Sequence, residues 1–245
     1  MRSRSGIPEA VALLATTNVI NNRVLPWLHA RTASSRAASR GGPSVAYVGS
    51  CLLTASALVA LARRRGLTWK ELGLGGHSLR RGLIGAAGAA ATVGAVYGAG
   101  LAMPPTRSLF ADERAAPRLS GAAYQALVPV PFGTVLLEEV GFRGVLWGLV
   151  KRRYGAAAAT AASSVLFGLW HVLPARELAK SNTTVASAVG SGARLTATSV
   201  AGTALGGLVL SELRRRSDSL LVPAGLHWAL NGLGYVAAVL AKRGR

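Results

Sequence analysis

Polar side chains that can activate water lie inside three apolar stretches of this sequence. They are Glu138, Glu139 and Arg143 in the first stretch, His171 in the second, and His227 with Asn231 in the third. A charged side chain at the depth of a bilayer core costs at least about 2.5–3.5 kcal/mol on insertion scales, so such residues are rare and usually functional. A carboxylate or imidazole can act as a general base on water, and an imidazole or amide N–H can stabilise an oxyanion. These residue types indicate hydrolysis by an activated water.

The spacing of the three charged residues in the first stretch indicates that two of them pair with each other and the third does not. Glu139 and Arg143 are four residues apart, so they can pair on one face of a helix. Glu138 points about 100° away from that face and is left for another task. His227 and Asn231 are also four residues apart, so both project from one face of their helix.

The composition indicates an integral membrane protein. Of the 245 residues, 51% are hydrophobic and 15% are charged, and the mean hydropathy is +0.37, which is apolar for a soluble domain. The net charge of +19 raises the question of nucleic acid. However, the basic residues form short clusters between apolar runs, as in loops that face anionic lipid head groups. We therefore expect a multi-pass protein of the cell membrane that contacts the lipid bilayer and binds no nucleic acid.

Seven apolar stretches are candidate membrane spans, and the first of them is the weakest. They are residues 10–30, 44–62, 82–103, 119–150, 154–173, 195–211 and 219–241. Pro129 and Pro131 with Gly133 should break or kink the fourth stretch, and we expect the fifth to end at Pro174 before a polar loop over 175–194.

These spans predict an all-α transmembrane bundle of about seven to eight helices, which follows from roughly 20 apolar residues per crossing. Residues 1–118 would supply N-terminal helices with a basic linker, and residues 119–245 a catalytic helical core, within one integral membrane unit.

The polar residues are predicted to lie at comparable depths. Counted from the neighbouring basic loops at about 1.5 Å per residue, Glu138 is roughly 20 Å deep, His171 roughly 27 Å, His227 roughly 16 Å and Asn231 roughly 22 Å. Three helices thus place polar groups in the half of the membrane far from those loops. A small excess of basic residues on the side of the N-terminus predicts that this side is cytoplasmic.

Three short motifs give a family resemblance. Residues 138–143 match EExxxR, residues 167–171 match FxxxH from Phe167 to His171, and residues 227–231 match HxxxN. In this order, on separate apolar helices, the motifs resemble the CPBP family of intramembrane proteases. That family includes the type II CAAX prenyl endopeptidases and the Abi-like bacteriocin-processing or immunity proteins.

The resemblance implies an intramembrane endopeptidase that cuts a peptide bond of a membrane-associated protein or peptide, either lipidated or a precursor. It implies that Glu138 and His171 activate the nucleophilic water and that His227 and Asn231 stabilise the oxyanion. Glu139, Arg143 and Phe167 would then have supporting roles around these four catalytic residues.

A zinc-dependent mechanism is the main alternative. One carboxylate and two imidazoles, from Glu138, His171 and His227, are a plausible zinc set with water in the open position. Against it, the sequence has no HExxH helix, and Asn231 is a poor zinc ligand but a good oxyanion donor. The sequence favours hydrolysis that requires no cofactor, with zinc as the alternative.

Two non-proteolytic functions also stay open. In an ion- or proton-coupled transporter, Glu138, His171 and His227 would relay protons or bind a cation. The absence of an evident inverted repeat weighs against this reading. A non-catalytic immunity or scaffold protein would keep the same helices and use them for binding only.

Overall fold

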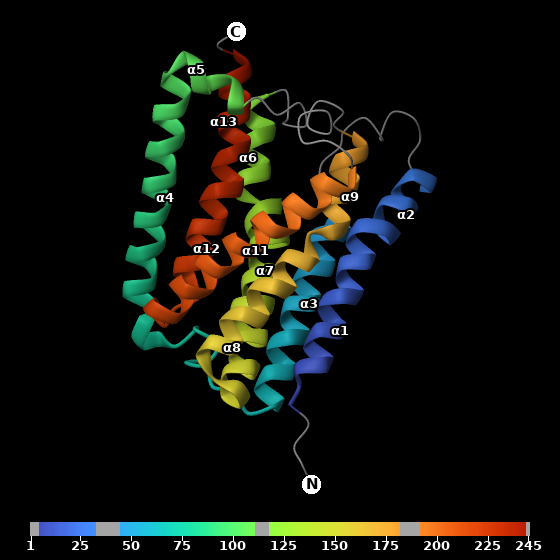
Figure 1. The fold of residues 1–245 in the computed structure, drawn as a ribbon, viewed down its shortest axis with the longest axis vertical. Coiled ribbons are helices and arrows are strands. Elements are labelled where there is room, and N and C mark those ends of the chain that lie inside the picture. Colours follow the sequence, from blue (N-terminus) through green and yellow to red (C-terminus); the bar gives the residue numbers. More distant parts are fainter. Residues whose placement is uncertain (1–4, 33–44, 111–117, 182–191, 244–245) are drawn as a thin grey trace.

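The structure, a computed structural model, is an all-helical bundle, as predicted. It describes residues 5–32, 45–110, 118–181 and 192–243, and these contain no β-strand. Helices α1, α3, α4, α6 and α13 run roughly along the long axis of the molecule, with α4 at one edge and α1 at the other, and α11 crosses the bundle obliquely (Figure 1). The bounds of the helices are α1 Ile7–Val19, α2 Leu25–Thr32, α3 Val45–Arg64, α4 Leu79–Ala102, α6 Leu119–Leu127, α7 Leu136–Glu138, α8 Trp147–Trp170, α9 Val172–Ser181, α11 Gly192–Ser217, α12 Leu221–Trp228 and α13 Gly234–Arg243.

Shorter segments connect these helices. Four of them are π-helical, namely η1 Ile20–Val24, η4 Pro129–Val135, η5 Glu139–Leu146 and η6 Ala229–Leu233. The others are the 3₁₀ turns η2 Gly76–Ser78 and η3 Ser108–Phe110 and the single-turn helix α5 Pro104–Arg107. Wide π-helical turns inside longer helices are frequent at functional sites, and here they coincide with the EExxxR and HxxxN motifs.

Five helical runs among the described residues are long and apolar enough to cross a membrane. They are Val45–Arg64, Gly76–Ala102, Leu119–Glu177, Gly192–Ser217 and Leu221–Arg243. The third run has 59 residues and contains two of the predicted spans. The first predicted span, residues 10–30, is helical throughout but is not one of the five.

The long run Leu119–Glu177 folds back on itself at Gly155. This glycine has φ 85° and ψ 172°, a conformation that only glycine adopts readily, so α8 is two segments joined at a sharp turn. Hydrogen bonds join residues before the turn to residues after it, and the farther the first residue lies before Gly155, the farther its partner lies after it. Trp147 Nε1 donates to Thr160 Oγ1, and Ser163 Oγ donates to the Phe142 carbonyl. The EExxxR and FxxxH motifs therefore lie on the two arms of an antiparallel hairpin.

Two sequence-based expectations for this region need correction, and a third is confirmed. Helix α8 ends at Trp170 and not at Pro174, which lies in the first turn of α9, where the missing N–H of proline costs little. The predicted polar loop over 175–194 is helical up to Ser181 and again from Gly192, and residues 182–191 lie outside the described part. The predicted break near the prolines is present at Val128, whose φ and ψ are −123° and −70°.

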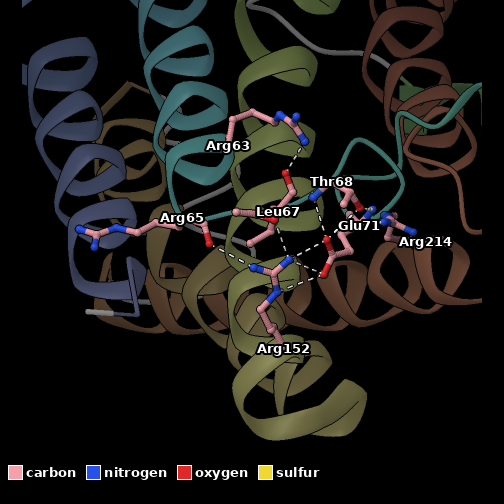
Figure 2. A network of polar contacts seen from close by, with 8 residues as sticks. Arg63, Arg65, Leu67, Thr68, Glu71, Arg152 and Arg214 are labelled. Atoms are coloured by element: carbon pink, nitrogen blue, oxygen red, sulfur yellow. Dashed lines mark hydrogen bonds and ion pairs between the residues drawn. The ribbon is translucent and has the colours of Figure 1, made fainter. Parts of the chain in front are cut away.

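Three of the basic segments, residues 63–65, 151–153 and 214–216, contribute arginines that lie close together at the end of the bundle where α3 and α11 finish (Figure 2). Arg152 donates to both carboxylate oxygens of Glu71 and to the carbonyls of Arg65 and Gly66 at the end of α3. The buried Arg214 donates to the Glu71 carbonyl from α11. These contacts join the link after α3, the hairpin turn and the end of α11, so three of the basic loops between apolar stretches lie together.

Glycines on the first arm of the hairpin, before Gly155, let α1 and the link after α3 pack tightly against this arm. A Cβ added at Gly141 would lie 2.8 Å from Leu14 Cδ2, and one at Gly148 would lie 2.6 Å from Leu67 Cδ2. The main apolar core forms at these contacts and joins α1, α3, η5 and α8. The segment η5 is consequently buried at all eight residues, Glu139–Leu146, including its two charged side chains.

Candidate active site

Glu139 and Arg143 form the ion pair that their spacing predicts. Arg143 Nη1 donates to Glu139 Oε1 at 3.1 Å, and the two side chains are 0% and 1% exposed. The guanidinium carbon also lies 3.9 Å from the centre of the Phe167 ring, which is cation–π geometry. Burial of an ion pair is costly unless further polar contacts support it, so this pair fixes the arm of the hairpin only together with its other partners.

His227 is the further partner of Glu139. Its Nδ1 lies 2.7 Å from Glu139 Oε1, and because a carboxylate only accepts, Nδ1 carries the proton of that hydrogen bond. Its Nε2 then faces Glu138, at 3.7 Å from Oε2, which is too long for a direct hydrogen bond. The imidazole of α12 is therefore held by one carboxylate and presented to the other.

Glu138 is buried and is held by only one of its two oxygens. The indole Nε1 of Trp170, on the other arm of the hairpin, donates to Oε1 at 3.0 Å. The other oxygen, Oε2, is buried and has no hydrogen-bond partner. Oε2 of Glu139 also has no hydrogen-bond partner. The two side chains differ in their donors, because Glu139 Oε1 accepts from both Arg143 and His227, whereas Glu138 accepts only from a neutral indole.

Phe167 and His171 lie beside this cluster. His171 Nδ1 is 2.8 Å from the Phe167 carbonyl, which only accepts, so the imidazole donates from Nδ1 and keeps Nε2 for another partner. The Phe167 ring contacts His171 and His227 edge-on, with ring centres 4.7 and 5.9 Å apart. Among the described side chains, no hydrogen bond joins His171 directly to Glu138. The two are adjacent through Trp170, which precedes His171 and binds Glu138.

Asn231 lies on a cavity and not in the hydrogen-bonded cluster. A cavity of about 550 Å³ is lined by Asn231, Thr134, Val130 and Tyr235, together with residues of α4 and η3. A second cavity of about 430 Å³ shares Val130, Thr134 and Tyr235 and extends toward α2 and α3. Thr134, which lines both cavities, precedes Glu138 by four residues on the same arm of the hairpin. The cavities therefore lie against the arm that carries Glu138.

The residues of the zinc alternative do not form a ligand cluster. Within the described part of the chain, no group of three His, Cys, Asp or Glu side chains is close enough to hold a metal ion. The Nδ1 hydrogen bonds of His227 and His171 would themselves be compatible with ligation through Nε2. It is the separation of the three side chains that prevents Glu138, His171 and His227 from holding a zinc ion in this arrangement.

Sequence reasoning missed the part played by Trp170 and Asn18. Tryptophans in apolar helices are usually packing residues, and the partner of this indole N–H lies 32 positions away in the sequence. Asn18 of α1 donates to the Trp170 carbonyl at 2.7 Å, and it lies in the weakest of the predicted spans, to which the sequence assigned no functional residue. An asparagine or indole inside an apolar helix needs a hydrogen-bond partner, and that requirement is the signal that was available.

The comparisons with known proteins concern the same region. Residues 121–233 match a family model described as type II CAAX prenyl endopeptidase Rce1-like, and this range includes all three motifs. No curated protein and no solved structure matches the chain. The resemblance to CPBP proteases is thereby confirmed. This multi-pass integral membrane protein is similar, over residues 121–233, to the Rce1-like type II CAAX prenyl endopeptidase family.

Proposed function

We propose that the protein is an intramembrane endopeptidase in which Glu138 is the base that activates water. One observation carries the proposal. Glu138 is only 5% exposed, its Oε1 is held by Trp170, and its Oε2 has no partner. Buried polar atoms are nearly always paired, so an unpaired carboxylate oxygen 3.7 Å from Nε2 of His227 is suited to take a proton from water. Oε2 of Glu139 is unpaired as well, but Glu139 is already bound to Arg143 and His227 through its other oxygen.

His171 is the second residue in water activation. Its Nδ1 bond to the Phe167 carbonyl leaves Nε2 as the nitrogen that accepts or shares a proton. The position of His171, directly after the tryptophan that binds Glu138, supports a water shared between the two side chains. Phe167 supports this imidazole by an edge-on ring contact.

His227 and Asn231 stabilise the oxyanion that develops on the cleaved carbonyl. Glu139 fixes the orientation of the His227 ring, and Arg143 in turn holds Glu139. Nε2 of His227 then points toward the reacting end of Glu138. In the imidazolium form both ring nitrogens carry a proton, so Nε2 would offer an N–H to a developing negative charge. Asn231 would add its amide N–H from the wall of the neighbouring cavity.

The substrate is a membrane-associated protein or peptide, lipidated or a precursor. The two adjoining cavities are lined by apolar side chains and by neutral polar groups such as Tyr47, Gln125 and Thr134. Neutral donors and acceptors suit the amide groups of a polypeptide backbone, and apolar walls suit its side chains or an attached lipid.

Catalysis requires no metal in this proposal. The three zinc candidates do not converge, whereas the hydrogen bonds already present orient each imidazole for proton transfer. Glu138, His171, His227 and Asn231 would then supply all catalytic groups.

Membrane proteomics tests the proposal. Cells that carry the wild-type protein are compared with cells that carry Glu138→Ala or His171→Ala, and His77→Ala serves as the control because this histidine lies in η2, at the basic end. We expect a membrane protein or peptide to accumulate uncut with the two site variants and to be processed with wild type and control. An unchanged membrane proteome, or pH-dependent ion flux without any cleavage, would overturn the proposal in favour of transport.

A further inference from the structure

Trp170 and Asn18 form a connection from the N-terminal helix to the carboxylate of Glu138. We propose that Trp170 is a positioning residue for the reaction, which holds Glu138 in its working orientation, and that Asn18 holds Trp170. The inference rests on the proposed protease function and adds two residues to it. It gives helix α1, which lies outside the family match at 121–233, a place in the catalytic geometry.

The first contact fixes the rotation of the carboxylate. The indole Nε1 of Trp170 can only donate, and its acceptor is Glu138 Oε1 at 3.0 Å. The terminal torsion of a glutamate is broad and has no strong preference of its own. A hydrogen bond to one oxygen therefore determines where the other oxygen points, and here Oε2 points to the Nε2 side of His227.

The second set of contacts fixes the indole ring. The Phe142 ring meets Trp170 edge-on with ring centres 5.7 Å apart, and it meets Phe167 in the same way at 5.3 Å. Both phenylalanines are less than 5% exposed. The ring of Trp170 thus packs against Phe142, which in turn packs against the Phe167 ring that contacts Arg143 and His171.

The third contact fixes the backbone at Trp170. This residue is the last of α8, where carbonyls have no partner within the helix. Asn18 Nδ2 donates to the Trp170 carbonyl at 2.7 Å. Asn22 Nδ2 donates to Asn18 Oδ1 at 2.7 Å, so the amide of Asn18 is oriented with its donor toward α8. The turn that carries both Trp170 and His171 is consequently held by α1.

The sequence contains a matched control for this tryptophan. Trp228 also has a single indole hydrogen bond inside the bundle, to the Ala126 carbonyl at 2.7 Å. Trp170→Phe and Trp228→Phe therefore each keep an aromatic ring and remove one N–H donor. Only the first removes a donor to a carboxylate.

The experiment measures kcat, KM and thermal unfolding of the purified full-length variants on a substrate that the wild type cleaves. For Trp170→Phe we expect kcat to fall about ten- to a hundredfold, the range for a hydrogen bond to a charged group. KM should stay within about twofold, since Trp170 lines neither cavity assigned to the substrate. Trp228→Phe should unfold at a similar temperature to Trp170→Phe and keep kcat within about twofold of wild type. Asn18→Ala should lower kcat in the same direction by a smaller factor.

The outcomes separate this inference from the proposed function. If wild type cleaves and Glu138→Ala does not, but Trp170→Phe keeps its kcat, the inference is wrong and the protease function stands. Equal losses of kcat in Trp170→Phe and Trp228→Phe, in proportion to lost stability, would also overturn the positioning role. If Glu138→Ala cleaves as fast as wild type, the proposed function fails and the inference fails with it.

Discussion

Two adjacent carboxylates, Glu138 and Glu139, should respond in opposite ways to the same isosteric change. Glu139→Gln leaves the guanidinium of Arg143 buried without its charge partner. The two side chains are 1% and 0% exposed, and removal of one partner from such a buried pair costs about 3–5 kcal/mol. Glu138→Gln keeps an amide oxygen for the indole of Trp170 and removes no other hydrogen bond, so we expect less than about 1 kcal/mol.

The assay is equilibrium or thermal unfolding of both variants in the same detergent or bicelle, with proteolytic activity measured in parallel. We expect Glu139→Gln to lose stability and Glu138→Gln to keep its stability and lose activity. A double variant in which Arg143→Met accompanies Glu139→Gln should recover part of the lost stability, because it removes the uncompensated charge. Equal destabilisation by the two single variants would refute the division between a structural and a reacting carboxylate.

Three further predictions concern packing, pH and metal. Gly168→Ala should cost about 1–3 kcal/mol of unfolding free energy, because its Cβ would lie 2.7 Å from the Val200 carbonyl oxygen, whereas Gly202→Ala has open space and should cost nothing measurable in the same unfolding assay. Burial alone would raise the pKa of Glu71, but hydrogen bonds from Arg152 and Thr68 outweigh burial and hold it at about 2 against an ordinary 4.5. Glu71 therefore stabilises the fold above about pH 4.5 and loses this contribution as the pH falls toward 2, and unfolding between pH 5 and 2 should be less acid-sensitive in Arg152→Ala than in wild type. A chelator should leave cleavage by the purified protein unchanged, and a loss that zinc restores would contradict the metal-free proposal.

Local spacing was enough to predict the contacts that lie within one helix. The pair Glu139–Arg143 follows from four-residue spacing, and the break at Val128 follows from the nearby prolines. Both features depend on neighbours in the sequence. The all-helical membrane fold follows in the same way from the length of the apolar stretches.

Contacts between different helices could not be predicted from local spacing. The bond from His227 to Glu139 joins residues 88 positions apart, and the bond from Asn18 to Trp170 joins residues 152 apart. The sequence gives the hydrogen-bonding capacity of each side chain but not which helix faces it. The helix end predicted at Pro174 was wrong because proline is compatible with the first turn of a helix as well as with the end of one.

The most direct measurement is cleavage of an identified substrate by purified wild type and Glu138→Gln reconstituted in liposomes. The proposal predicts that Glu138→Gln keeps wild-type stability and loses about 10²–10⁴-fold in kcat, the usual contribution of a general base. Cleavage by Glu138→Gln at close to the wild-type rate would contradict the assignment of Glu138 as the residue that activates water.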